Sequence, residues 1–307
     1  MGYEARVLAD SVTEFDDRLT TLEVTFPRFV LPEFNTHRVF SRNSASSRAV
    51  PVEKRLLQVL DEPVLPIEWG ANKPGMQSIE LLSESDRLIA ESEWLKSRDH
   101  AVIGAVALVG GLGKMKNEAL VSRVNELYVR YNLKIPELIQ GVHKQFVNRI
   151  LEPYMWHTVV VSSTEWDNFM ALRRHPDAQP EIRKVADLMD DAIESSEPME
   201  LGEGQWHLPF VLEEERTLSF DILAKLAVAR CARVSYETHD TGKIDQAKDI
   251  ALHDSLRDSG HMSPFEHVAR PMTNEEYMQN PWSGNFLGWH QYRKDIPYED
   301  NYLEAQQ

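Results

Sequence analysis

The apolar residues of this chain repeat with two different periods, and the change between them restricts the fold more than any other sequence feature. Residues 5–12 and 20–31 are rich in Val, Leu, Thr and Phe with partial alternation, which predicts two strands, the second closing on Pro32. From Pro51 to about Asn132 the apolar residues recur every three or four positions, which predicts helices. Strands followed by packing helices indicate the α+β class.

The same spacing rules predict further elements along the chain. Helices are expected at 52–60, 79–95, 118–131, 135–156 (starting at Pro136), 165–172, 219–232 and 245–259. A strand, HTVVVSS, is expected at 157–163. Residues 195–215 hold two glycines and two prolines among acidic residues, which is typical of a linker. The tail after 259 is aromatic and polar with little periodicity.

Length and composition describe an ordinary globular protein. The 307 residues are 42% hydrophobic, enough for a sizeable core in one large or two small domains. The longest apolar stretch, 101–109, is far shorter than the roughly 20 residues that span a bilayer. The N-terminus lacks the pattern of a secretory signal, and Cys231 is the only cysteine, so no internal disulfide can form. We therefore expect a cytoplasmic protein without membrane contact.

The net charge of −16 restricts how this chain could bind an anion. A protein this acidic repels nucleic acid unless it carries a local basic patch, so a nucleic-acid partner is not expected. An anionic ligand would have to be bound by clustered arginines. The sequence offers two clusters, Arg38, Arg42 and Arg48 in one and Arg149, Arg173 and Arg174 in the other.

The densest polar segment is residues 35–48, NTHRVFSRNSASSR, directly after the second predicted strand. Arginine forks and serine hydroxyls suit a phosphate or an electron-rich ring. A second segment, GHMSPFEH at 260–267, could suggest zinc, but its two histidines lie six residues apart and Pro264 interrupts a helix, so no metal site is expected. GGLGK at 110–114 lacks the glycine and the Ser or Thr of a phosphate loop, and is interpreted as a helix end.

These segments resemble those of the flavin-dependent thymidylate synthases. The signature of that family is Arg-His-Arg, seven residues, then Ser and commonly an Arg two residues later, and here Thr36-His37-Arg38 is followed by Ser46 and Arg48. The family's Ser-Pro-Phe-Glu-His and Ala-Arg-Val-Ser elements resemble 263–267 and 232–235. A later set of family positions resembles Arg149, Pro153, Asn168, Leu172 and Arg173, with Ala178 and Gln179 following.

The segment order differs from the family's, in which the two elements found here at 232–267 come first. The resemblance therefore implies a circular permutation, with a mixed sheet flanked by helices and with inserted helices. It implies one permuted catalytic domain over 1–307. Its expected parts are a strand and nucleotide motif (1–50), inserted helices (51–132), a nucleotide and flavin helix-strand-helix unit (133–194), a linker (195–215), and a flavin-binding segment with tail (216–307).

The resemblance implies an FAD-dependent enzyme that transfers a one-carbon unit from methylenetetrahydrofolate to C5 of dUMP, with NADPH as co-substrate and a homotetramer as the assembly. Arg173 would activate the pyrimidine by stabilising the charge that develops on the ring. The nucleotide would be bound by Glu33, Ser44, Ser46, Arg48, Arg149 and Arg173. The flavin would be bound by His37, Arg38, Asn168, Ser235, His261, Ser263 and Glu266.

Four departures from the family pattern alter this expectation. Thr36 stands where the family has its first signature arginine, for which Arg42 or Arg293 could substitute. Ser44 replaces a glutamate, Ala49 an aromatic residue, and Glu33 a glutamine that touches the nucleotide. A carboxylate accepts from the amine of cytosine, so dCMP is a second candidate substrate. Two more hypotheses stay open: a flavin- or nucleotide-binding relative without catalysis, and a nucleic-acid binder that uses the arginines of 38–48.

Overall fold

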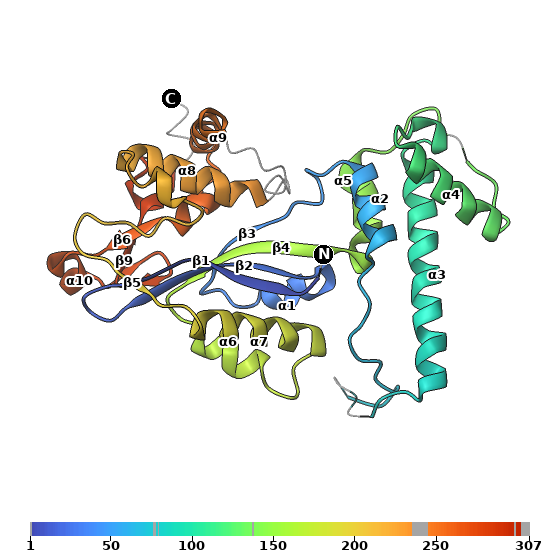
Figure 1. Ribbon diagram of the computed structural model, residues 1–307, viewed down its shortest axis with the longest axis horizontal. Coiled ribbons are helices and arrows are strands. Elements are labelled where there is room, and N and C mark those ends of the chain that lie inside the picture. The colour runs from blue at the N-terminus through green and yellow to red at the C-terminus, as the bar shows by residue number, and fades with distance from the viewer. Residues whose placement is uncertain are drawn as a thin grey trace.

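The computed structural model describes residues 2–75, 78, 80–136, 138–234, 245–297 and 299–301. At its centre lies a five-stranded sheet in the order β3-β4-β2-β1-β5 (Figure 1). The strands are β1 (Glu4–Val12), β2 (Arg18–Pro27), β3 (Ser41–Ser44), β4 (Trp156–Ser163) and β5 (Met199–Glu200). β5 pairs in parallel with β1, and the other pairs are antiparallel. The mixed sheet flanked by helices confirms the predicted fold class.

Helices and short elements surround this sheet. The helices are α1 (Leu31–Phe34), α2 (Val52–Asp61), α3 (Glu84–Leu108), α4 (Glu118–Arg130), α5 (Lys144–Val147), α6 (Asp167–Arg173), α7 (Pro180–Glu194), α8 (Phe220–Arg233), α9 (Gln246–Asp258) and α10 (Asn274–Gln279). Two small two-stranded sheets pair β6 (Ala269–Pro271) with β9 (Trp289–Gln291), and β7 (Trp282–Ser283) with β8 (Phe286–Leu287). Short 3₁₀ segments lie at Arg28–Val30, Leu112–Lys114, Asn148–Tyr154, Glu213–Glu215, Ser263–His267 and Tyr292–Asp295. No helix in these described ranges is both long and apolar enough to cross a bilayer.

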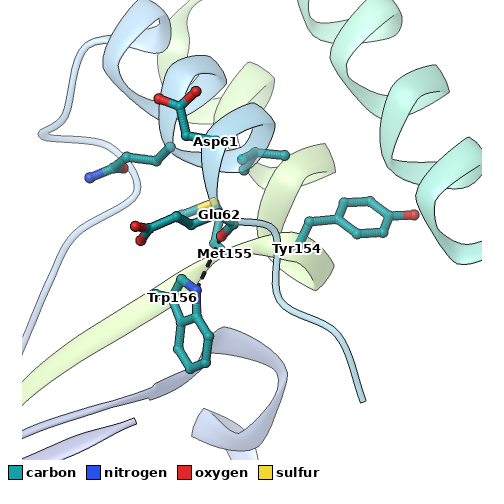
Figure 2. Close-up of a pocket in the computed structure, with 7 residues that line it drawn as sticks. Asp61, Glu62, Tyr154, Met155 and Trp156 are labelled. Carbon is teal, nitrogen blue, oxygen red and sulfur yellow. Dashed lines mark hydrogen bonds between the residues drawn. The ribbon is translucent and has the colours of Figure 1, made fainter. Parts of the chain in front are cut away.

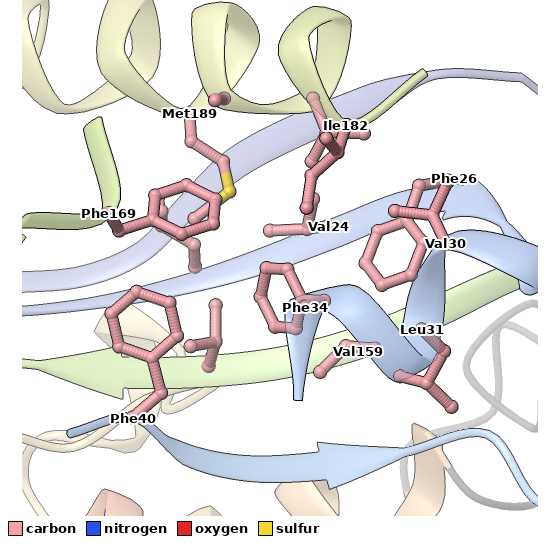
Figure 3. Packing of buried hydrophobic residues seen from close by; sticks show 14 of the residues in the cluster. Val24, Phe26, Val30, Leu31, Phe34, Phe40, Val159, Phe169, Ile182 and Met189 are labelled. Atoms are coloured by element: carbon pink, nitrogen blue, oxygen red, sulfur yellow. The ribbon is translucent and has the colours of Figure 1, made fainter. Parts of the chain in front are cut away.

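One face of the sheet is apolar and is covered by α1, α6 and α7 (Figures 1 and 3). Val24 and Phe26 of β2 pack there against Phe34 of α1 and Phe169 of α6, and all four are fully or almost fully buried. The rings of Phe34 and Phe169 meet edge to face with centroids 5.7 Å apart. This packing fixes the end of α6 beside the loop that follows α1, which is where the candidate site lies.

The opposite face of the sheet carries the C-terminal part of the chain and holds a set of buried polar residues. Thr21 of β2 and Ser162 of β4 are neighbours in register, and their hydroxyl oxygens are 2.6 Å apart. Thr21 also contacts Nε2 of His207 at 2.7 Å, and Ser162 contacts Nδ1 of His267 at 2.8 Å. Ser11 completes the chain at 2.9 Å from Nδ1 of His207. A continuous hydrogen-bond network thus links His207 and His267 to the sheet.

We expect this buried network to make the fold sensitive to acid. Burial lowers the pKa of His207 and of His267 to about 3. Because these values lie below the usual 6.5, the unfolded chain binds more protons between pH 6.5 and 3, so stability is complete above about pH 6.5 and falls below it. Each histidine contributes up to about 1.4 kcal/mol per pH unit. Urea unfolding should show a loss of about 2–4 kcal/mol from pH 7 to pH 5.

A His207→Gln/His267→Gln double variant is the control for this prediction, since it lacks both titrating rings. Its unfolding free energy should depend less steeply on pH than that of the wild type. Equal wild-type stability at pH 5 and pH 7 would show that the two rings are not held in the neutral form.

The helices α2, α3 and α4 form a second core beside the sheet. Val102 and Val106 of α3 pack with Leu120 and Val124 of α4 and with Leu56 of α2, all fully buried. α2, α4, α8 and α9 begin and end within one residue of the predicted bounds. α3 begins at Glu84, where the Ser83 hydroxyl caps the backbone N–H of Asp86. It runs to Leu108, well beyond the expected end at 95. GGLGK does follow the end of a helix, as expected.

The helix predicted at 135–156 is wrong. Only α5 and the turn Asn148–Tyr154 are helical within the described part of that range. Gly141 passes so close to the end of α3 that an added Cβ would lie 2.3 Å from the carbonyl oxygen of Val109. The next residue, Val142, donates its backbone N–H to Leu108 at 2.6 Å. This backbone contact holds the chain out of a helix.

Two further segments differ from their expected structure. The strand predicted at 20–31 ends at Pro27, since a 3₁₀ turn follows and Pro32 occupies the first turn of α1, where a missing N–H is tolerated. α7 is absent from the predicted helices, although Pro180 starts it and its buried residues follow helical spacing. The segment 195–215 contains β5 and the 3₁₀ turn Glu213–Glu215 and buries Leu201 and His207.

Candidate functional site

Arg173 at the end of α6 is bound on all three of its side-chain nitrogens by residues of α1 and of the loop that follows it. Nε donates to Nε2 of His37 at 2.8 Å, and Nη2 donates to Oγ1 of Thr36 at 3.1 Å. Nη1 donates to Oε1 of Glu33 in an ion pair. Residues that are about 140 positions apart in the chain therefore form one cluster. It joins the proposed catalytic arginine to the first part of the family-like signature.

His37 is neutral in this cluster. Burial, helped by the charges of Arg173 and Arg42, lowers the pKa of His37 to about 4. Its Nε2 can then accept from Arg173 while Nδ1 carries the proton. Arg42 donates to the carbonyl oxygens of Phe34 and His37 and so braces the same loop. His37 is thus turned toward Arg173 and is almost fully buried.

The serine-rich segment is joined to the segment of Arg149 by a buried asparagine. Asn148 donates to the carbonyl oxygen of Ser47 at 2.6 Å and to that of Val50 at 3.0 Å. Lys144 donates to the carbonyl oxygen of Ala49 at 2.9 Å. These bonds hold the segment that contains Arg48 against the segment that contains Arg149.

Three arginines differ from the others in having no partner among the described residues. In the described part of the chain, every arginine side chain takes part in a hydrogen bond or ion pair except Arg38, Arg48 and Arg149. All three are exposed. On a protein with net charge −16, arginines without carboxylate partners are available to an anionic ligand.

The C-terminal segment Ser263–His267 packs against β3 and so approaches the signature segment. The Ser263 hydroxyl donates to Oδ1 of Asn43 at 2.8 Å. Glu266 accepts from Arg293 at 2.5 Å, and Arg293 also pairs with Glu299 at 2.7 Å. Gln291 of β9 donates to Oδ1 of Asn285 at 3.0 Å, while Ser41 of β3 donates to the same oxygen at 3.1 Å.

The remaining expected site residues are more scattered. Asn168 near the start of α6 and His261 are exposed, Ser46 accepts from the backbone N–H of Arg48, and Ser44 is half-buried in β3. Ser235 lies outside the described residues. Arg42 and Arg293, the arginines that could substitute at position 36, are engaged by carbonyl oxygens and by carboxylates respectively. The asparagines that hold the segments together, Asn43 and Asn148, gave no sequence signal, because their partners are distant in the chain.

The segment that precedes Ser235 is anchored by a buried ionic network. Arg230 of α8 donates to both carboxylate oxygens of Glu215 at 2.6 Å and to Asp249 of α9 at 3.0 Å. Arg233 donates to the other oxygen of Asp249 at 2.7 Å. The Arg230 guanidinium holds the pKa of Glu215 down to about 2. The network holds α8 and α9 together.

A cavity of about 170 Å³ lies away from these residues (Figure 2). It is lined by Gln58, Val59, Asp61, Glu62, Tyr154, Met155 and Trp156. Figure 2 shows the Trp156 indole bonded to the carbonyl oxygen of Glu62, at 3.1 Å. None of the candidate site residues lines it, and the cavity lies where α2 meets the turn Asn148–Tyr154 and the start of β4.

The fold and the site together define an α+β protein in which Arg173, partly exposed, lies where segments that are distant in sequence come together. The chain belongs to the thymidylate synthase complementing protein family, whose model matches residues 11–199. It is thus a thymidylate synthase-like enzyme. The matched range includes the signature and Arg173 but not the segments at 232–235 and 263–267.

Among the solved structures that this chain matches are two enzymes. One is the UMP/dUMP methylase PolB from Streptomyces cacaoi bound with 5-Br UMP, at 16% identity and a TM-score of 0.38, covering 62% of this chain and 87% of that one. Another is thymidylate synthase X (ThyX) from Helicobacter pylori with FAD and dUMP, at 17% identity and a TM-score of 0.29, covering 57% and 67%. No curated protein sequence matches the chain.

Proposed function

We propose that this protein is a flavin-dependent enzyme that transfers a one-carbon unit from methylenetetrahydrofolate to C5 of a pyrimidine deoxynucleotide monophosphate, with dUMP as the substrate that the family implies. The observation that carries the proposal is the set of unpaired arginines. The family pattern assigns four arginines to flavin and nucleotide, and three of them, Arg38, Arg48 and Arg149, are the ones left without partners in the described chain; the fourth is Arg173, which pairs with Glu33. Their charges fit the phosphates of both ligands.

Separate groups of residues serve the two ligands. Ser46, Arg48 and Arg149, with Ser44, bind the nucleotide phosphate and sugar. Arg38, His261, Ser263, Asn168 and Ser235 bind FAD, whose role is to supply the hydride that completes the methyl group. His37 and Glu266 do not contact the ligands but position other side chains. His37 orients Arg173, and Glu266 orients Arg293. The free guanidinium of Arg38 and the Ser263 hydroxyl beside β3 support this assignment of the FAD-binding residues.

Arg173 activates the pyrimidine. Its guanidinium, partly exposed beside Glu33, stabilises negative charge on an ionised or polarised ring and so makes C5 a better nucleophile. The C5 hydrogen would leave as a proton, and reduced FAD would supply the hydride that turns the transferred methylene into a methyl group, with tetrahydrofolate as the leaving group. NADPH, as the family implies, returns the flavin to its reduced form.

No thiolate takes part in the proposed reaction. Cys231 lies fully buried in α8 beside Val160 of β4, and burial raises the pKa of its thiol. A reactive cysteine needs an exposed and electropositive setting, which this one lacks. The placement of 263–267 against β3 supports a permuted order of family segments in a single domain. We also propose, from the family alone, a cytoplasmic homo-oligomer.

Anaerobic turnover tests the proposal. Protein supplied with FAD, NADPH, methylenetetrahydrofolate and a pyrimidine deoxynucleotide should yield a C5-methylated nucleotide, and a Cys231→Ala variant should keep turnover within a few-fold of wild type. Loss of turnover in folded Cys231→Ala would require a covalent cysteine mechanism. FAD binding without any turnover on dUMP or dCMP would favour the non-catalytic relative.

A further inference from the structure

The ion pair of Arg173 and Glu33 presents an ordered set of hydrogen-bonding groups to a ligand. Both side chains are partly exposed, at 18% and 29%. Nη1 and Nη2 of Arg173 each carry two hydrogens, of which Glu33 and Thr36 take one each, so two donors remain. In the described chain Oε1 of Glu33 makes the bond to Arg173, and Oε2 makes none. The pair therefore offers one acceptor next to two donors.

Cytosine and uracil present different patterns of hydrogen-bond donors and acceptors to these groups. The edge of cytosine presents an amine donor at C4, then the acceptors N3 and O2. Uracil presents an acceptor at C4, a donor at N3 and an acceptor at O2. An acceptor followed by two donors satisfies all three positions of cytosine. With uracil, one carbonyl faces the carboxylate or is left unpaired, which is unfavourable in a site that excludes water.

The charges of the cluster also favour cytosine over uracil. His37 is neutral as an acceptor, and the negative charge of Glu33 offsets the positive charge of Arg173. The pair therefore stabilises an ionised uracil ring less than a lone guanidinium would. Cytosine has no N3 proton to lose, and its amine bonds directly to the carboxylate.

We propose that Glu33, held by Arg173, makes this protein select a cytosine nucleotide, dCMP, over dUMP. The inference rests on the proposed function, because it takes the base to lie at Arg173. Glu33 is then the residue that determines specificity at C4, and Arg173 contacts N3 and O2. Thr36 contributes by holding Nη2 in place without adding a positive charge.

Calorimetric titration of FAD-saturated protein with dCMP and with dUMP tests this inference. We expect wild type to bind dCMP at least about ten-fold more tightly, which corresponds to about 1.4 kcal/mol. Glu33→Gln replaces the fixed acceptor by an amide that can also donate, so it should abolish or reverse the preference. Glu68→Gln is the matched control: it removes an ion pair with Arg183 of similar exposure elsewhere, and should leave the ratio unchanged.

Wild type that binds the two nucleotides equally, or dUMP more tightly, would overturn the inference. So would a preference for dCMP that persists in Glu33→Gln, or binding of neither nucleotide by wild type. If Glu33→Gln unfolds, Thr36→Arg provides a second variant, since the added charge beside Arg173 should shift the ratio toward dUMP. Failure to bind FAD would instead contradict the proposed function, so the two failures are distinguishable.

Discussion

Replacing Arg173 by lysine is expected to lower turnover by about 10²–10³-fold, the range found when one donor to developing charge is lost. An ammonium cannot reproduce the planar fork that holds Glu33, Thr36 and His37 at once. The released Glu33 carboxylate and neutral His37 would also lose their fixed positions. Steady-state rates with saturating nucleotide measure the effect.

Arg174→Lys is the matched control for this prediction. Arg174 is the next residue in the chain, is exposed, and pairs with Asp187 and Asp190 of α7 rather than with the candidate site. Its replacement should change turnover by no more than a few-fold, because exposed ion pairs contribute little. Near-wild-type turnover in Arg173→Lys would remove Arg173 from the proposed mechanism.

Replacing Glu215 by alanine is expected to destabilise the fold by about 3–5 kcal/mol, because it leaves the buried Arg230 charge without its bidentate partner. Both side chains are less than 10% exposed, and Asp249 compensates for only part of the loss because it also pairs with Arg233. Urea unfolding measures the change. FAD affinity should fall in parallel, since the network anchors the chain before Ser235.

Glu213→Ala controls for the loss of a carboxylate in the same turn. Glu213 pairs with Arg216 at the surface and is 88% exposed, so its removal should change stability by about 0–1 kcal/mol. Adding Arg230→Met to Glu215→Ala should restore part of the lost stability, because it removes the uncompensated charge. A loss below about 1 kcal/mol in Glu215→Ala would show that water already reaches Arg230.

Local sequence signals predicted most of the regular structure. The strand HTVVVSS and the helices α2, α4, α8 and α9 follow directly from apolar spacing and turn residues. The predictions failed at two places where apolar periodicity carries no information. Gly141 is held against the end of α3 by a backbone contact that is distant in sequence, and Pro32 lies in the first turn of a helix instead of closing a strand.

The candidate site was less accessible to sequence reasoning, because its contacts are long-range. The motifs identified His37, Arg48, Arg149 and Arg173, but nothing in the sequence indicated that Glu33 binds Arg173 across 140 residues. The fastening of Ser263–His267 to β3 through Asn43 spans 220 residues. Such pairings depend on how the sheet and the C-terminal part fold together.

Whether the purified protein binds FAD is the most direct test of the account. We expect the protein either to purify yellow or to quench FAD fluorescence in a saturable titration, and Arg38→Ala to weaken that binding because it removes an unpaired guanidinium. Arg183→Ala, which removes a paired arginine away from the site, should bind FAD as wild type does. A colourless, folded protein with no saturable FAD binding would contradict the proposed flavin-dependent function.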